Sequence, residues 1–178
     1  MKIISLILII IGLLWIISIV IAPLTLEPGT VILGEDGGAN HVDYPDLWIR
    51  LPLFQKIVYG LGDLICHQKT SRSFIINGNQ MPVCARDVGL YLGILIALIP
   101  LYVLNIRCPI IYKRFISKLF GSKIKFLILY FIFSGPLIID FSTQYIGLRT
   151  SDNITRFITG LLFGFMNMIL FYHLLLEE

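Results

Sequence analysis

Charged residues are scarce in this chain. Asp, Glu, Lys and Arg make up 14% of its 178 residues, whereas 57% are hydrophobic, and the mean hydropathy is +0.87. This composition excludes an ordinary soluble domain and favours an integral membrane protein. The basic residues stand beside apolar segments and not on a soluble face interleaved with aromatic residues. The sequence therefore indicates no nucleic-acid partner.

The first apolar segment lacks the features of a cleaved signal peptide. Residues 3–21 carry no charge, and the stretch exceeds the roughly 7–15 apolar residues of a signal-peptide core. It is not followed by an A-x-A cleavage pattern, and Pro23 comes directly after Ala22. We therefore expect a retained anchor helix over residues 1–22.

Four apolar segments are long enough to cross a bilayer, which takes about 20 residues. The fold class expected is an all-α polytopic membrane bundle with four transmembrane helices and one interfacial helix. Two glycine pairs at small-x-x-x-small spacing, Gly89 with Gly93 and Gly160 with Gly164, predict close helix packing. The predicted spans are residues 3–21, 88–106, 126–148 and 157–176.

The region between the first two spans divides by composition. Residues 23–51 contain Gly, Pro and acidic residues, which predicts an extracytoplasmic loop rich in turns. Residues 52–178 then form the main membrane domain with three spans. It opens with LFQKIVYGLGDLICHQ, whose helical spacing predicts the interfacial helix. Asn77 and Gly78 predict a tight turn before the second span.

The connection between the second and third spans contains no acidic residue. A loop with this excess of Lys and Arg is expected on the cytoplasmic side. Four spans then place both termini in the cytoplasm and residues 23–86 outside, together with the turn near Arg149. The basic residues of the connection are Arg107, Lys113, Arg114, Lys118, Lys123 and Lys125.

Polar side chains interrupt the outer third of the third span. Their spacing of i, i+3, i+4 and i+7 puts them on one helix face. An acid at that depth is costly unless it faces a polar interior or a partner. We therefore expect this face to meet the polar residues of the neighbouring segments at the extracytoplasmic end of the bundle. The face consists of Asp140, Thr143, Gln144 and Gly147.

The first hypothesis for this end of the bundle is a metal site. Cys66, His67, Cys84 and Asp87 are ligand types suited to a divalent metal such as zinc, although the chain has no C-x-x-C pair. The alternative is a disulfide between Cys66 and Cys84, because extracytoplasmic cysteines often pair. Free thiols are the third possibility.

The second hypothesis, which leads as the expected function with metal handling as its alternative, is binding of, or action on, a lipid-linked anionic group. Membrane lipid would be the partner, since arginine binds phosphate through a bidentate fork and helix amino ends favour anions. Asp140 or Asp87 would hold a metal or act as base. Phosphate would be held by Arg86, Arg149 and Arg156, with Gln144 and Asn153 orienting the headgroup. The catalytic candidates are Asp140, Gln144 and Asp87.

Plainer roles compete with both hypotheses. The arginines could pair with the neighbouring acids or extend to lipid headgroups. The thiols could serve redox chemistry, and the chain could also be a transporter or a structural subunit. The first and last spans carry few polar groups, which counts against a transporter.

Several motifs resemble the predicted membrane proteins grouped as domain of unknown function family 2085 (DUF2085). The motifs are CHQ, RSF, GNQMPVCARDVGLYLG and DFSTQYIGLRTSDNITRFITGLLFG, within residues 59–164. The resemblance implies a small helical membrane protein and names no activity. The family pattern reads C-A-R-C-x-G where this chain has Asp87 after Cys84, Ala85 and Arg86. This departure weakens a dithiol mechanism, leaves metal binding open and favours a Cys66–Cys84 pair.

Overall fold

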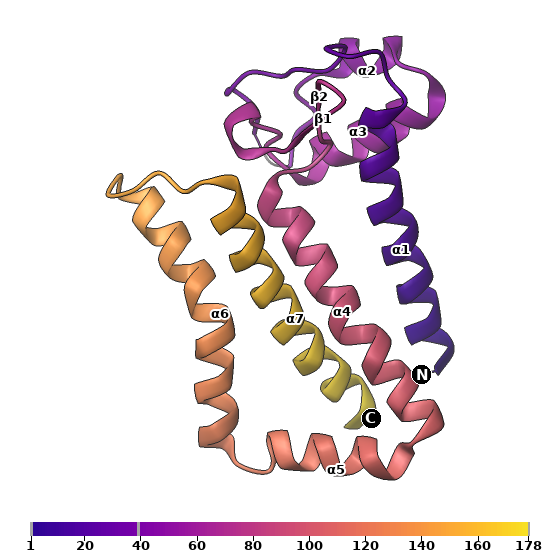
Figure 1. The fold of residues 1–178 in the computed structure, drawn as a ribbon, viewed down its shortest axis with the longest axis vertical. Coiled ribbons are helices and arrows are strands. Elements are labelled where there is room, and N and C mark those ends of the chain that lie inside the picture. Colours follow the sequence, from indigo (N-terminus) through magenta and orange to yellow (C-terminus); the bar gives the residue numbers. More distant parts are fainter. Residues whose placement is uncertain (1, 39, 178) are drawn as a thin grey trace.

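The computed structural model describes residues 2–38 and 40–177, which are mostly helical (Figure 1). Four long helices form the bundle, and a small cap stands on one end of it. We call residues 25–84 the cap. In chain order the elements are α1 (Lys2–Leu24), α2 (Pro45–Arg50), α3 (Leu53–Ile65), η1 (Thr70–Arg72), β1 (Ile75–Ile76), β2 (Asn79–Gln80), α4 (Ala85–Arg107), α5 (Pro109–Phe120), α6 (Lys123–Tyr145) and α7 (Asn153–Glu177).

The four predicted spans are confirmed as α1, α4, α6 and α7, each long and apolar enough to cross a membrane. One end differs from the prediction, because α6 stops at Tyr145. Gly147 adopts a φ of 72° and the Leu148 amide donates to the Thr143 carbonyl, a left-handed helix stop. Gly147 thus lies in the turn, while Asp140 and Gln144 stay within the helix.

The closest packing in the bundle is between α4 and α7. Both helices supply their glycine pairs to this contact, as predicted. A Cβ added at Gly89 would lie 2.0 Å from the Phe157 carbonyl oxygen, and one at Gly160 would lie 2.1 Å from that of Arg86. Gly93 and Gly164 meet the opposite backbone in the same way. Backbone-to-backbone contact therefore sets the distance between these spans.

The cap confirms two local predictions. The helix predicted after Pro52 is α3, and the Asn77-Gly78 turn joins β1 to β2 as an antiparallel hairpin. Both turn residues have positive φ, 51° and 69°, as a two-residue hairpin loop requires. Residues 23–51 also contain the short helix α2, whose Trp48 stacks on Tyr59 of α3 at 5.3 Å.

Buried amide side chains hold the cap together. The Asn79 side chain accepts from the Val31 amide at 3.0 Å and donates to the carbonyls of Pro23 and Glu27. Gln80 accepts from the Leu33 amide at 3.1 Å. These bonds cross the predicted boundary between residues 51 and 52 and satisfy backbone groups that the irregular segment leaves unpaired.

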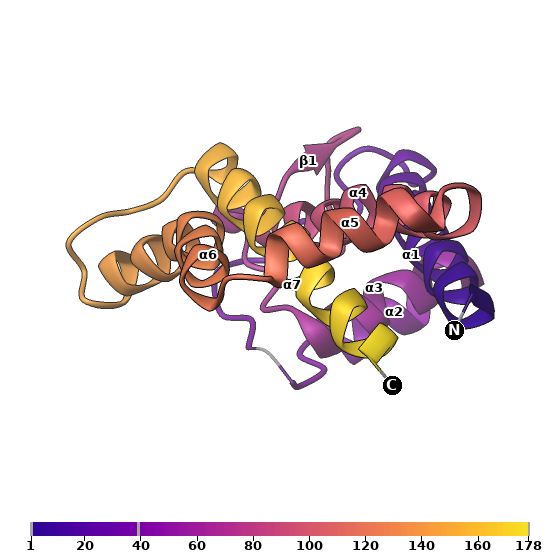
Figure 2. The ribbon, with the colours of Figure 1, turned by 90° about the horizontal axis from the view of Figure 1, so that it is seen from below.

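Helix α5 is absent from the sequence-based prediction and lies across the end of the bundle opposite the cap (Figures 1 and 2). Pro109 is its first residue, a position that tolerates proline. Tyr112, Ile116 and Leu119 follow at helical spacing and pack against a core that includes Tyr172 of α7. The prediction for this segment rests on its positive charge alone and omits that spacing.

Candidate functional site

Three of the four predicted metal ligands meet at the junction of the cap and α4. One ligand atom each from Cys66, Cys84 and Asp87 lies within 4.8 Å of the other two. Cys66 is 2% exposed, and the other two side chains are half-buried. We call these three residues the thiol–carboxylate group.

The local fold brings Cys66 to Cys84. Helix α3 ends at Ile65, and Cys66 is extended. Gln68, at a φ of 46°, donates its side-chain amide to the carbonyls of Tyr59 and Pro82, at 3.1 and 2.7 Å. The chain after α3 is thereby tied to the segment before α4.

Glycine makes this approach possible. A Cβ at Gly62 would lie 2.2 Å from the Pro82 carbonyl oxygen. The other two members of the group come from the start of α4, where Cys84 is the N-cap and Asp87 is in the first turn. Helix amino ends favour negative charge, so the first turn of α4 suits the Asp87 side chain.

Hydrogen bonds link the three residues directly. The Cys84 amide donates to the Cys66 sulfur at 3.1 Å, and the Cys84 thiol donates to Asp87 Oδ2 at 3.2 Å. A hydrogen bond with the Cys84 side chain, together with burial, raises the pKa of the Cys66 thiol. Cys66 is therefore a neutral thiol at neutral pH unless a cation stabilises its thiolate.

Two further predictions for this region concern His67 as a metal ligand and a disulfide between Cys66 and Cys84. His67 is exposed and is not one of the three residues whose ligand atoms come together. Cys66 and Cys84 are both free cysteines, close enough that the disulfide stays a prediction for oxidising conditions. Cys108 is free as well and lies at the junction of α4 and α5, at the other end of α4.

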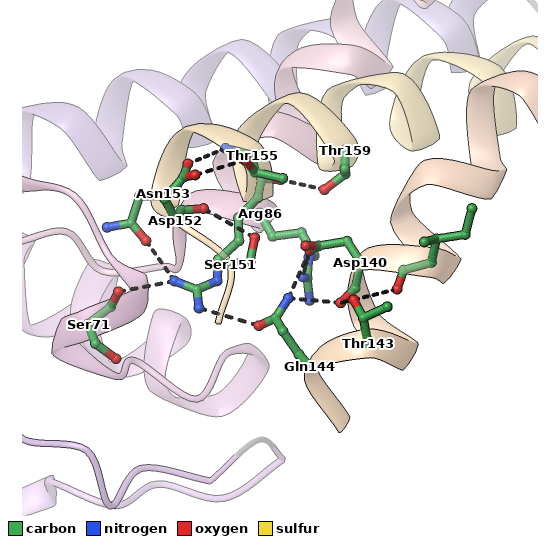
Figure 3. A network of polar contacts seen from close by, with 12 residues as sticks. Ser71, Arg86, Asp140, Thr143, Gln144, Ser151, Asp152, Asn153, Thr155 and Thr159 are labelled. Atoms are coloured by element: carbon green, nitrogen blue, oxygen red, sulfur yellow. Dashed lines mark hydrogen bonds and ion pairs between the residues drawn. The ribbon is translucent and has the colours of Figure 1, made fainter. Parts of the chain in front are cut away.

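A second polar group joins α4, α6 and α7 to the cap (Figure 3). Asp140 of α6 forms an ion pair with Arg86 of α4, and the Asp140 side chain is only 4% exposed. The Gln144 side chain donates to Asp140 Oδ2 at 2.9 Å and accepts from Arg156 at 3.3 Å. We call Arg86, Asp140, Gln144, Asn153 and Arg156 the arginine network.

The network reaches the cap through backbone carbonyls. Arg156 donates to the Ser71 carbonyl at 3.1 Å and to the Asn153 side chain at 3.0 Å, and Asn153 donates to the Ser73 carbonyl at 3.0 Å. Asn153 and Gln144 thus position arginines in this structure. The sequence offered no signal for Ser71 and Ser73, because they act through their main chain.

Some buried atoms of the network have no hydrogen-bond partner. They are the Nε atoms of Arg86 and Arg156 and Oδ1 of Asp140. Two guanidinium groups face one carboxylate here, so the network carries excess positive charge. Arg149, predicted to bind phosphate with them, is exposed in the turn after α6 and is not among the residues joined by these bonds.

Comparison with known proteins assigns the chain to a family. Residues 66–170 match the family described as "Predicted membrane protein (DUF2085)", which is more than half of the chain. The chain belongs to DUF2085. The matched region begins at Cys66 and includes every residue of the thiol–carboxylate group and of the arginine network.

Two archaeal proteins described as uncharacterized are similar to this DUF2085 protein. A protein of Methanocaldococcus jannaschii is 43% identical over 118 residues, 65% of each chain. A protein of Methanothermobacter thermautotrophicus is 32% identical over 97 residues, 54% of this chain and 75% of the relative. The chain thus spans just under two thirds of the length of the first relative. No solved structure matches the chain.

Proposed function

We propose that this DUF2085 protein binds a divalent metal such as zinc through Cys66, Cys84 and Asp87. The observation that carries the proposal is the approach of three ligand atoms to within 4.8 Å. Zinc binds sulfur at about 2.3 Å and carboxylate oxygen at about 2.0–2.2 Å, so in tetrahedral geometry the ligand atoms of one ion lie about 3.5–3.8 Å apart. Binding would therefore draw the ligand atoms of the group closer together by up to about 1 Å.

The surroundings support the same chemistry. The amide that donates to the Cys66 sulfur is the kind of outer hydrogen bond that orients metal ligands. Three protein ligands leave one coordination position for water or a substrate, as in catalytic zinc sites. The group therefore fits an exchangeable or reactive metal better than a closed structural one.

Metal analysis of the purified protein tests this function. We expect about one zinc per chain after equilibration with zinc and desalting. Cys66→Ser and Asp87→Asn should each lower the zinc affinity at least tenfold. Cobalt substituted for zinc should show sulfur-to-cobalt charge-transfer absorption that these variants weaken.

Cys108→Ser is the matched control, since Cys108 is a free cysteine at the other end of α4. It should keep the full zinc content. Wild-type protein without zinc, or the same loss in Cys108→Ser, would overturn the proposal. So would an intact Cys66–Cys84 disulfide in protein purified without reductant, detected by non-reducing mass spectrometry.

We propose as a second candidate that the arginine network binds the anionic headgroup of a membrane lipid. The specific support is the pair of buried, unpartnered Nε atoms beside a single carboxylate. Arg86 and Arg156 would bind the phosphate, while Asp140, Gln144 and Asn153 hold the guanidinium groups in place. Catalysis by Asp140, Gln144 or Asp87 stays a prediction.

Lipid mass spectrometry of the purified protein tests this candidate. Arg86→Gln and Arg156→Gln should reduce the phospholipid that co-purifies, whereas Arg149→Gln should not, because Arg149 is exposed outside the network. Equal retention in all variants, or an equal loss in Arg149→Gln, would refute the candidate.

A further inference from the structure

A pocket of about 400 Å³ lies between α5 and α6, at the end of the bundle opposite the cap. It shares no residue with the thiol–carboxylate group or the arginine network. Its lining combines two lysines with three apolar side chains, namely Phe115, Lys118 and Leu119 of α5 and Lys125 and Leu129 of α6.

Along α6, the lysine of the pocket comes before its apolar residue. Lys125 lies in the first turn of the helix, and Leu129 is one turn further toward the middle of the span. Lys118 on α5 is exposed like Lys125. The pocket therefore presents positive charge at the end of the span and an apolar wall deeper along it.

Neither lysine is neutralised by a nearby acid along its own part of the chain. No acidic residue occurs from position 88 to 139. Among the residues that the structure describes, the one ion pair joins Arg86 and Asp140, near the cap. Among the side chains that the structure describes, neither Lys118 nor Lys125 therefore forms an ion pair with an acid.

The apolar surface continues from the pocket along α6. Ile128, Phe131 and Ile132 are 54%, 58% and 60% exposed, which suits contact with acyl chains. Helix α5 itself presents the exposed Ile111 and Phe115 beside basic residues. Helices of this kind lie in the interface of anionic membranes.

We propose that this pocket binds an anionic membrane lipid. The headgroup phosphate contacts Lys118 and Lys125, and the first part of an acyl chain lies against Leu129 and the exposed face of α6. The inference goes beyond the proposed function, because it concerns the opposite end of the bundle. It follows from charge complementarity between the lysines and an anionic headgroup.

Photocrosslinking in nanodiscs tests the proposal at the pocket itself. The full chain is reconstituted in phosphatidylcholine with a small fraction of photoactivatable phosphatidylglycerol, and crosslinked peptides are mapped by mass spectrometry. We expect crosslinks within residues 115–129, reduced on the order of tenfold in a Lys118→Gln/Lys125→Gln variant. Leu129→Trp, which fills the pocket and keeps both charges, should also reduce them.

The control variant is Arg107→Gln/Arg114→Gln, which removes two exposed positive charges outside the pocket lining. It should leave the crosslinks nearly unchanged. Equal loss in this control would mean general surface charge and overturn the proposal, as would equal labelling by photoactivatable phosphatidylcholine. Competition by soluble glycerol phosphate would indicate a site for free phosphate esters and overturn it too.

Discussion

Asp63 shows how single polar residues in this chain serve the fold. It is fully buried, and its Oδ2 accepts hydrogen bonds from the amides of Asp43 and Tyr44 and from the Trp48 indole, the last at 2.7 Å. Helical spacing alone would group Asp63 with Cys66 and His67. In the structure these hydrogen bonds to the Asp63 side chain instead hold the segment before α2 in place.

Asp63→Ala should therefore destabilise the cap. The substitution leaves three N–H donors without their acceptor, and the free energy of unfolding should fall by about 3 kcal/mol or more. Thermal unfolding in detergent, followed by tryptophan fluorescence, measures this loss. Asp36→Ala is the control because Asp36 is an exposed acid of the cap. Equal stability of the two variants would contradict this role.

At the scale of elements, glycine residues allow two close backbone contacts, one at α3 and one between α4 and α7. On α3, Gly62 allows the approach to Pro82 that places Cys66 beside Cys84, and on α4 and α7 the glycine pairs bring the two backbones together. In each case a carbonyl oxygen occupies the space that a Cβ would need. Backbone atoms cannot move aside as easily as a flexible side chain.

Gly160→Ala should destabilise the α4–α7 contact by about 1–3 kcal/mol, because the new Cβ overlaps the Arg86 carbonyl. The control is Gly135→Ala in α6, where nothing lies within 4 Å of the added atom. It should be neutral or slightly stabilising, since Ala favours helix over Gly. The melting temperatures of both variants in detergent decide the point, and similar shifts would argue against backbone contact.

Gly62→Ala should weaken zinc binding without removing a ligand. Its Cβ forces α3 away from Pro82 and so moves Cys66 relative to Cys84. Gly60→Ala, two residues earlier in the same helix, places its Cβ in open space and should bind zinc like the wild type. Zinc titrations compare the pair. Unchanged affinity in Gly62→Ala would show that the α3 approach does not position the ligands.

At the scale of the whole molecule, the four spans separate two different ends. The cap and both polar groups lie at one end, while the two termini and α5 lie at the other (Figure 1). The basic residues of α5 and its flanks then favour the cytoplasm for the second end. The thiol–carboxylate group would face outside.

Reporter fusions test this orientation. Green fluorescent protein fused to the C-terminus should fluoresce, and alkaline phosphatase fused there should be inactive, because the terminus is expected in the cytoplasm. Phosphatase inserted after Asp36, in the exposed part of the cap, should be active. The reverse pattern would place the cap in the cytoplasm and would require a new account of its cysteines.

Much of the fold could be predicted because it depends on short-range patterns. Uninterrupted apolar segments predicted the four spans, helical spacing predicted α3, and Asn77-Gly78 predicted the hairpin turn. Helix α5 was missed because its apolar spacing is short and lies among basic residues. The role of Gln68 and Asn79 was missed because their partners are distant backbone groups.

By itself the sequence determined membrane class, span number and the polar residues available at one end, since these follow from composition and local periodicity. Only the tertiary structure decided which of those residues belong to the thiol–carboxylate group and which belong to the arginine network. Arg86 and Asp87 are neighbours in the chain, but successive residues of a helix point about 100° apart. Arg86 therefore pairs with α6, whereas Asp87 meets Cys84 beside Cys66. Which neighbour a side chain meets depends on the helices packed around it.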